Sequence, residues 1–454
     1  MKNTTATWIT RRKTIRYFSF ATLLIVLTGT PCLATDLAPT PPMGWNSWDS
    51  YGLTVTEAEF KANVSWLHQH LQPLGWQYVV VDEGWYLRQP GQKGAAQGFV
   101  MDAEGRYLVA DNRFSSSGFK PVADWVHSQG LKFGLHIIRG VPRQAVEKNL
   151  PIAGSVFHAA DAANTADTCR WNSDNYGLKA NAASQAYYDS IIKLYAGWGV
   201  DYIKVDCISK PYQADEIHMM SAAIVKSGRA IVLSLSPGPT PIEQADDVKK
   251  YAQLWRISDD MWDTWSAPEG QTFPAGLVRQ FDRTAQWAPH IVAGHWPDAD
   301  MLPLGYLGPR PGWKEPRMSR LTADESRTLM TLWSMARSPL VAGTNLTRMD
   351  KATEALYSNP EVIAVDQHSS QNRERSRTGS LIVWTATPES GGGHYVAVFN
   401  LRDATQDVSY AWKDLGLPEG GHAVRDLWAR KDLGSAASLK TTLRAHASVL
   451  YRLR

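Results

Sequence analysis

The sequence predicts an α/β protein: a (β/α)8 TIM barrel followed by an antiparallel β domain. Eight short β-rich runs alternate with helix-like segments between residues 43 and 344, which is the pattern of parallel β/α units. Polar or aromatic residues stand at the carboxyl ends of most runs, where such a barrel has its active-site face. After about residue 355 the chain changes to short strands separated by Gly- and Pro-rich turns.

The eight runs suit one barrel with insertions. They span residues 43–48, 78–85, 131–137, 201–207, 230–236, 254–260, 290–300 and 338–344. The segments TEAEFKANVSWLHQHL and DESRTLMTLWSMA between them predict amphipathic helices. A doubly wound sheet is the alternative, but no Gly-rich phosphate loop follows the first strand. The 454 residues, 44% hydrophobic and 20% charged, are sufficient for a large core.

Residues 1–34 predict a signal peptide. Four basic residues between positions 11 and 16 precede the apolar run FSFATLLIVLTG, which is too short to span a bilayer, and Ala34 offers a small residue for cleavage. This leader holds five of the 47 Lys and Arg, so the mature chain has 42 basic against 44 acidic side chains, a net charge of −2. We therefore expect an exported protein, periplasmic or extracellular, that has no membrane anchor after cleavage and does not bind nucleic acid.

Two cysteines remain in the mature chain, Cys169 and Cys207. An even number in an exported chain favours one disulfide, with a free pair as the alternative. Cys169 lies in the longest gap between predicted strands, residues 139–177, which we interpret as a long loop over the barrel mouth. We place the catalytic barrel at residues 35–354 and the C-terminal β domain at residues 355–454.

The run YIKVDC predicts an ionised carboxylate at the barrel mouth. The alternation of a strand puts Lys204 and Asp206 on one face, and a neighbouring lysine lowers the pKa of a carboxyl group. An ionised carboxylate there suits a nucleophile; a structural salt bridge is the alternative.

The run LWRISDDMWDTW supplies a second acidic group. Asp259, Asp260 and Asp263 lie among three tryptophans, and we expect this crowding to raise a carboxyl pKa, as a general acid requires. Asp206 and Asp260 close the fourth and sixth strands, where they could flank one sugar ring. Glycoside hydrolysis uses such a pair, about 5–5.5 Å apart for retention and about 6.5–9.5 Å for inversion.

Asp298 and Asp300, in GHWPDADML, raise the alternative of a metal site. These acids stand at a strand end rather than in an EF-hand calcium loop, and no pair of histidines has zinc spacing. We therefore expect neither a metal nor another cofactor.

The chain resembles the alpha-galactosidase family, glycoside hydrolase family 27, in five motifs that occur in order. They are PPMGWNSWDSYG, VVVDEGW, YIKVDC, WRISDDMWDTW and GHWPDADMLPLG. The resemblance runs from about Pro41 to the C-terminus. It implies a (β/α)8 barrel with a C-terminal antiparallel β-sandwich, and retaining hydrolysis through a glycosyl-enzyme intermediate.

By position, the resemblance also implies roles for individual residues. Asp206 matches the nucleophile and Asp260 the acid/base. The substrate-binding residues that it implies are Trp48, Asp82, Glu83, His136, Lys204, Arg256 and Asp300. Cys169 and Cys207 match a pair that forms a disulfide beside the nucleophile.

Three departures concern the sugar rather than the reaction. Family members usually have two aspartates after the second strand, and here the second is Glu83, whose extra methylene moves a charge by about 1–1.5 Å. That shift crowds the C6 hydroxymethyl of galactose, which β-L-arabinopyranose lacks, and the family includes arabinopyranosidases with this Asp-to-Glu change. His136 stands where a tyrosine is common, and Leu235 with Ser236 replaces a run that contacts the C2 substituent.

We therefore expect a retaining exo-glycosidase that releases terminal α-D-galactose from oligosaccharides or polysaccharides. The alternative within the same family is a β-L-arabinopyranosidase or an enzyme of dual specificity. A sugar-binding protein without turnover is a third hypothesis, which the presence of both Asp206 and Asp260 disfavours. The sequence predicts no oligomeric state and leaves the aglycone open.

Overall fold

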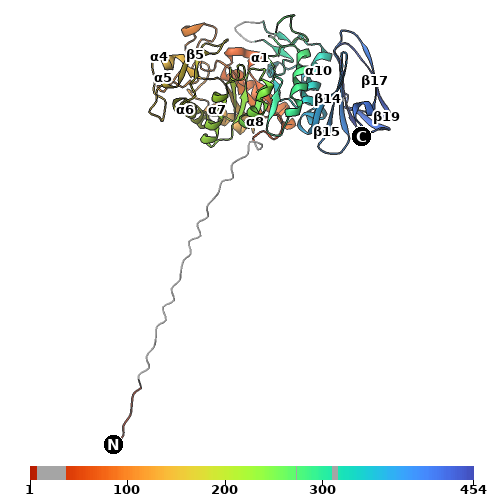
Figure 1. Ribbon diagram of the computed structural model, residues 1–454. Helices are drawn as coiled ribbons and strands as arrows, with labels where there is room; N and C mark the ends of the chain where they lie inside the picture. Colours follow the sequence, from red (N-terminus) through yellow and green to blue (C-terminus); the bar gives the residue numbers. More distant parts are fainter. Residues whose placement is uncertain (8–36, 272, 309–314) are drawn as a thin grey trace. The chain divides into compact units, whose positions relative to one another are not determined.

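A computed structural model describes residues 1–7, 37–271, 273–308 and 315–454 of the chain (Figure 1). Most of the predicted signal peptide, residues 8–34, and its cleavage site lie outside the described residues. In the described part of the chain, none of the helices combines the length and apolar character needed to cross a membrane.

Eight parallel strands form the first sheet, and each corresponds to one of the eight runs that the sequence indicated, with β3 extending one residue beyond its run. They are β1 (Met43–Asn46), β2 (Tyr78–Val81), β3 (Lys132–Ile138), β7 (Tyr202–Asp206), β8 (Val232–Leu235), β9 (Leu254–Arg256), β10 (Trp296–Asp298) and β13 (Leu340–Ala342). Their order in the sheet is β10-β9-β8-β7-β3-β2-β1-β13. Leu302, beyond β10, forms a parallel bridge with Ala342 of β13, and its N–H donates to the carbonyl of Val341 at 2.8 Å. This bridge joins the two ends of the sheet, so the predicted barrel is confirmed.

Helices follow each strand of the barrel. They are α2 (Glu57–His70), α3 (Lys120–Ser128), α6 (Ala182–Trp198), α7 (Ala214–Ser227), α8 (Ala245–Tyr251), α9 (Leu277–Trp287), α10 (Ala323–Ala336), α11 (Lys351–Tyr357) and α12 (Pro360–Gln367), with the short α1 (Trp48–Tyr51) directly after β1. Capping boxes start the two helices that the sequence predicted most clearly. Thr56 pairs with Glu59 at the start of α2, and Thr322 pairs with Glu325 at the start of α10.

Buried tryptophans connect the core to the barrel mouth. The indole N–H of Trp85 donates to the carbonyl of His136 at 2.8 Å, and that of Trp333 donates to the carbonyl of Asp300 at 2.8 Å. Both indoles are fully buried. Because a buried carbonyl needs a partner, these bonds hold the backbone of two strand ends in place.

The segment between β3 and β7 is not the long loop that the sequence predicted. It forms a small antiparallel sheet of β4 (Val141–Pro142), β5 (Ala163–Thr168) and β6 (Asn175–Leu178), with α4 (Arg143–Glu147) and α5 (Ala159–Ala162). Ala, Asn and Asp are frequent in this segment and have low strand propensity, so the sequence did not indicate strands. Tertiary contacts supply the order: a disulfide joins Cys169 to Cys207, and Arg139 Nη2 lies 2.6 Å from Asp167 Oδ1. The predicted disulfide is therefore present.

The C-terminal part is an antiparallel β-sandwich, drawn in blue in Figure 1. One sheet has the order β14 (Ser369–Thr378), β15 (Leu381–Pro388), β16 (His394–Asn400), β21 (Ser448–Leu453), β18 (His422–Asp426), β19 (Lys431–Ala436), and β17 (Gln406–Ala411) pairs with β20 (Ser438–Leu443) in the second. Val383, Val398 and Trp412 are among the buried side chains between them. The first strand begins at Ser369, whereas the predicted boundary at residues 354 and 355 falls within α11.

We expect the double variant Cys169→Ser, Cys207→Ser to lower the free energy of unfolding by about 2–4 kcal/mol, because the disulfide restricts the unfolded chain. Urea denaturation of the wild type and the variant measures the difference. Wild type unfolded in the presence of a reductant is the control and should show the same loss. An unchanged midpoint would mean that the crosslink does not constrain the unfolded chain.

Candidate active site

A pocket of about 580 Å³ opens at the carboxyl ends of the barrel strands, a volume typical of a small-molecule site. Eight of the nine predicted catalytic and binding residues line it: Trp48, Asp82, Glu83, Lys204, Asp206, Arg256, Asp260 and Asp300. The wall is completed by Asp49, Leu53, Trp171, Ser236, Pro237, Asp259, Met261, Trp262, Phe273 and Met301. The barrel thus brings together acids and bases from five strand ends.

Asp82, at the end of β2, is the most enclosed acid of this group, with 1% of the residue exposed. Its Oδ2 accepts from Lys204 Nζ at 3.0 Å and from Asn46 Nδ2 at 2.7 Å. Burial opposes ionisation, but the charges of Lys204 and His136 and the N–H of Glu83 lower the pKa of Asp82 far below its ordinary value. Asp82 is therefore a fixed anion.

Asp206 ends β7, and its two oxygens have different partners. Oδ1 accepts from the N–H of Cys207 at 2.6 Å, and Oδ2 accepts from Nε2 of His136 at 3.3 Å. Burial favours the neutral acid, yet the hydrogen bond and charge of His136, together with the charge of Lys204, lower the pKa of Asp206. The sequence attributed this effect to Lys204 alone; the structure places Lys204 against Asp82 and gives the direct contact to His136.

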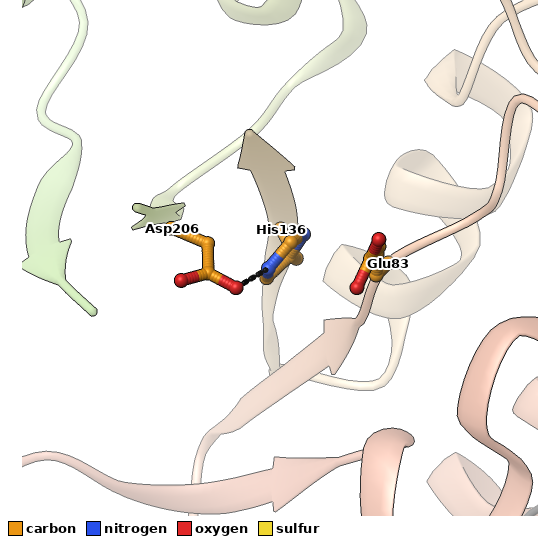
Figure 2. A group of neighbouring side chains, drawn as sticks. All are labelled: Glu83, His136 and Asp206. Carbon is orange, nitrogen blue, oxygen red and sulfur yellow. Dashed lines mark hydrogen bonds and ion pairs between the residues drawn. The ribbon is translucent and has the colours of Figure 1, made fainter. Parts of the chain in front are cut away.

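His136 lies behind the pocket rather than in its wall. It is 1% exposed, and Figure 2 shows its ring between Asp206 and Glu83. Burial alone would favour the neutral ring, but the charge of Asp82 and the hydrogen bond to Asp206 raise the pKa of His136. The acids around the ring therefore favour its protonated form, against the effect of burial.

Glu83, His136 and Asp206 also meet the spacing of a metal site, with one ligand atom of each within 4.8 Å of the others. Lys204 and the raised pKa of His136 already bring positive charge to this cluster.

Glu83 follows Asp82 and turns toward the pocket. Its Oε1 accepts from Nδ2 of Asn172 at 2.6 Å. Burial raises the pKa of Glu83 to about 7, and the neighbouring acids Asp206 and Asp82 add to the rise while His136 opposes it. Glu83 is therefore a carboxyl that exchanges its proton near neutral pH, unlike Asp82 beside it.

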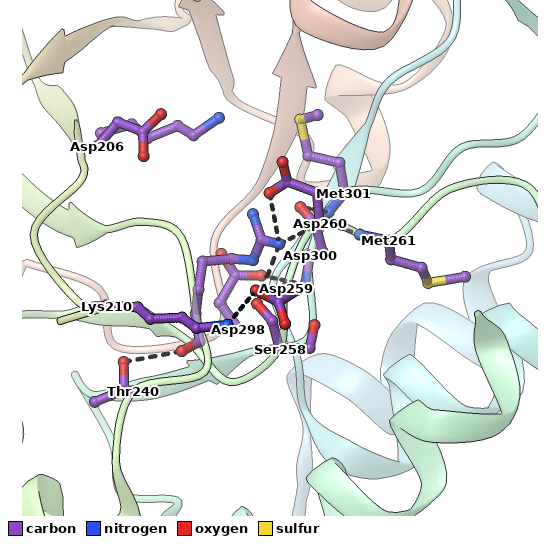
Figure 3. A network of polar contacts seen from close by, with 12 residues as sticks. Asp206, Lys210, Thr240, Ser258, Asp259, Asp260, Met261, Asp298, Asp300 and Met301 are labelled. Carbon is purple, nitrogen blue, oxygen red and sulfur yellow. Dashed lines mark hydrogen bonds and ion pairs between the residues drawn. The ribbon is translucent and has the colours of Figure 1, made fainter. Parts of the chain in front are cut away.

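A second group of charges surrounds Arg256, at the end of β9. Its Nη2 lies 2.5 Å from Asp300 Oδ2 and 3.2 Å from Asp260 Oδ1. Figure 3 shows Asp260 and Asp300 together, with Asp206 on the other side of the view. Asp300 is held further by the N–H groups of Met261 and Met301, at 2.7 Å each. The side chain of Asp260 remains 42% exposed, so water reaches it.

The remaining acids of the predicted motifs have structural contacts. Asp263 is buried and accepts from Arg317 Nη2 at 2.6 Å and from the N–H of Arg320 at 2.9 Å. Asp298 accepts from the N–H of Asp300 at 2.8 Å, which positions that residue at the pocket. Asp259 lines the pocket but pairs with Lys210 at 2.7 Å.

Sequence reasoning missed Asp49 and Asn172. Asp49 is buried in the pocket wall, and burial together with the charges of Asp300, Asp82 and Asp260 raises its pKa well above the ordinary value. Asn172 stands in the segment interpreted as a loop, where only its tertiary contact to Glu83 indicates a role. The adjacency of Asp49 to Trp48 in WNSWDSYG was the one available signal.

The fold and the pocket define a class of protein. Several carboxylates and paired cations in one pocket at the mouth of a (β/α)8 barrel suit a glycoside hydrolase. Comparisons with known proteins identify the family. Profiles described as "Alpha galactosidase A" and "Alpha galactosidase C-terminal beta sandwich domain" match residues 172–368 and 378–453.

Individual relatives agree over almost the whole length. The alpha-galactosidase of Coffea arabica is 31% identical over 93% of this chain and 95% of its own, and alpha-galactosidase A of Cellvibrio japonicus is 27% identical over 92% and 93%. The structure of a β-L-arabinopyranosidase of glycoside hydrolase family 27 from Geobacillus stearothermophilus is 45% identical over 92% of this chain and 97% of its own, with a TM-score of 0.87. The chain belongs to the alpha-galactosidase family, glycoside hydrolase family 27, and is a glycosidase whose substrate is a carbohydrate.

We expect Glu83→Gln to stabilise the protein at pH 8 but not at pH 4.5. Because folding raises the pKa of Glu83 to about 7, the folded state keeps a proton that the unfolded chain releases above about pH 4.5. Stability is lost as pH rises through this window, and glutamine avoids a loss of about 3 kcal/mol at pH 8. Thermal melts of wild type and variant at both pH values measure it.

Glu147→Gln, on the surface, is the control for the change of residue type. An equal shift in Tm at pH 4.5 and pH 8 for Glu83→Gln would contradict the raised pKa.

Proposed function

We propose that the protein is a retaining exo-glycosidase in which Asp206 is the nucleophile and Asp260 the acid/base. Asp206 attacks the anomeric carbon while Asp260 donates its proton to the leaving oxygen. Asp260 then takes a proton from water, which attacks the glycosyl-enzyme and releases the sugar with net retention. The observation that carries this proposal is the contrast between an anionic, enclosed Asp206 and a water-exposed Asp260 in one pocket.

The other charged residues fit binding roles. Asp82 and Lys204 are a fixed anion and a fixed cation at one end of the pocket, suited to accept from and donate to sugar hydroxyls. Arg256 and Asp300 form a second pair of a cation and an anion in the pocket, with the same capacity to bind sugar hydroxyls. Trp48 lines the pocket and offers an apolar face to the ring. His136 acts through Asp206, as a positioning residue.

We propose terminal α-D-galactosides as the substrate. The curated relatives that match at full length, such as those of Coffea arabica and Cellvibrio japonicus, are named alpha-galactosidases. Oligosaccharides and polysaccharide side chains with this terminal residue are the expected partners. Export to the periplasm or the exterior is supported by the basic and apolar leader and by the Cys169–Cys207 disulfide.

A second candidate, release of terminal β-L-arabinopyranose, is favoured by Glu83. The carboxyl group of Glu83 reaches further than that of an aspartate would. We infer that it extends toward the C6 hydroxymethyl of a bound galactose, a group that arabinopyranose lacks. The 45% identity to the arabinopyranosidase from Geobacillus stearothermophilus supports the same candidate.

We expect the mature protein to hydrolyse 4-nitrophenyl α-D-galactopyranoside, with α-galactose as the first product in proton NMR. Asp206→Asn should lose about 10³-fold or more in kcat, because no nucleophile remains to form the intermediate. Asp215→Asn, exposed at the start of α7, is the matched control. Initial formation of the other anomer, or full activity of Asp206→Asn, would refute the mechanism.

We expect Glu83→Asp to raise the ratio of kcat/KM for the α-D-galactoside over the β-L-arabinopyranoside by at least about tenfold, since one methylene in a pocket is worth about 10–200-fold. Initial rates on the two nitrophenyl glycosides measure the ratio. A wild type that prefers the arabinoside, with reversal in the variant, identifies the second candidate. A galactoside preference in both proteins supports the first.

A further inference from the structure

We propose that Asn172, on the hairpin between β5 and β6, is a positioning residue that sets sugar selectivity by holding the carboxyl group of Glu83. This inference rests on the proposed function, since it concerns which sugar the same pocket accepts. It assigns the inserted hairpin a role in substrate choice rather than in catalysis.

The first step is the contact itself. Nδ2 of Asn172 donates to Glu83 Oε1 at 2.6 Å, and Asn172 is only 9% exposed. A short hydrogen bond to a carboxyl oxygen, shielded from water, fixes the direction of that group. Glu83 has a longer side chain than aspartate and more rotamers, so its position depends more on such a contact.

The second step is that Asn172 is itself held at its other atom. Its Oδ1 accepts from the N–H of Asp174 at 2.8 Å, which defines which end of the amide faces Glu83. Asp174 is fixed in turn, because its Oδ2 accepts from the hydroxyl of Tyr86 at 2.9 Å. Tyr86 belongs to the same VVVDEGWY stretch as Glu83, so the hairpin tip is tied to the segment that it orients.

The third step is the anchoring of the hairpin on both sides of Asn172. On one side Cys169 is bonded to Cys207, the residue after the proposed nucleophile. On the other side Nδ2 of Asn175 donates to the carbonyls of Ile138 and Arg139 at 3.1 and 3.0 Å. Two residues lie between Asn172 and each anchor, so its position depends closely on the barrel rim.

A purely structural role for Asn172 is the competing explanation, because its Oδ1 also closes the hairpin turn through Asp174. The variant Asn172→Asp separates the two roles. It keeps the oxygen that accepts from the Asp174 N–H and has nearly the same size and shape. It replaces the Nδ2 donor, which serves Glu83 at 2.6 Å and Asp174 Oδ2 at 3.3 Å, by a carboxyl oxygen that repels Glu83. Asn172→Ala removes all three contacts.

The variants predict a change in selectivity rather than in chemistry. Without the donor, Glu83 is free to move toward His136, and the space beside the sugar's C5 position changes. Loss of a hydrogen bond to a charged or titrating group corresponds to about tenfold in affinity. The proposed catalytic pair, Asp206 and Asp260, is not touched by Asn172, so KM should change more than kcat.

The experiment compares full-length mature wild type, Asn172→Asp and Asn172→Ala. We would measure kcat and KM on the two nitrophenyl glycosides, and Kd for D-galactose and L-arabinose by calorimetry. The expected result is a change of about tenfold in the ratio of the two sugars for both variants. Asn164→Asp, the same substitution on β5 of the same hairpin, is the control and should keep the wild-type ratio.

A double-mutant cycle tests whether Asn172 acts through Glu83. In a Glu83→Ala background, Asn172→Asp should change the ratio less than about twofold. An unchanged sugar ratio in Asn172→Asp, or an equal change with and without Glu83, would overturn the inference. Hydrolysis by the wild type in the same experiment would leave the proposed function intact. If the wild type neither hydrolyses either glycoside nor binds either sugar, both proposals fail.

Discussion

The pairing of buried charges at the carboxyl ends of the strands is the constraint on which the site depends. An ionised carboxylate in a buried position costs several kcal/mol unless a cation and hydrogen-bond donors meet it. Asp82 is such a group, and Lys204 and Asn46 reach it from β7 and β1. Since the side chains of a strand alternate, a slip of one residue in either strand would turn these partners away. The register of the barrel strands therefore determines which charges pair in the pocket.

The acids of the pocket form two groups, each with its own basic side chains. Lys204, with His136, stabilises the anionic forms of Asp82 and Asp206. Arg256 contacts Asp300 more closely than Asp260, at 2.5 against 3.2 Å, so Asp300 takes the larger share of its charge. Asp206 and Asp260 therefore have unlike surroundings in the same pocket, as the proposed nucleophile and acid/base roles require.

Much of this could be predicted from sequence, because the signals were local. Alternation within YIKVDC placed Lys204 and Asp206 on one face, and the strand-end position of Asp82 and Glu83 placed both in the pocket. What failed was non-local. Asn172 contacts Glu83 across 89 residues of sequence, and nothing in its neighbourhood indicates this. Asp263, crowded by tryptophans in the sequence, is instead paired with arginines more than fifty residues away.

The contrast between Asp82 and Glu83 shows why a strand alone does not determine a binding site. The two acids are adjacent, yet one has a strongly lowered pKa and the other a pKa of about 7. Alternation directs Asp82 into the barrel, where Lys204 meets it, and turns Glu83 toward the rim. At the rim the strand supplies no partner, so the partner comes from the inserted hairpin through Asn172. The barrel therefore determines the charge of the first acid, and an insertion determines the direction of the second. Insertions vary more freely than barrel strands, so a change in the hairpin can alter the pocket wall beside Glu83 while Asp206 and Asp260 keep their positions on the barrel.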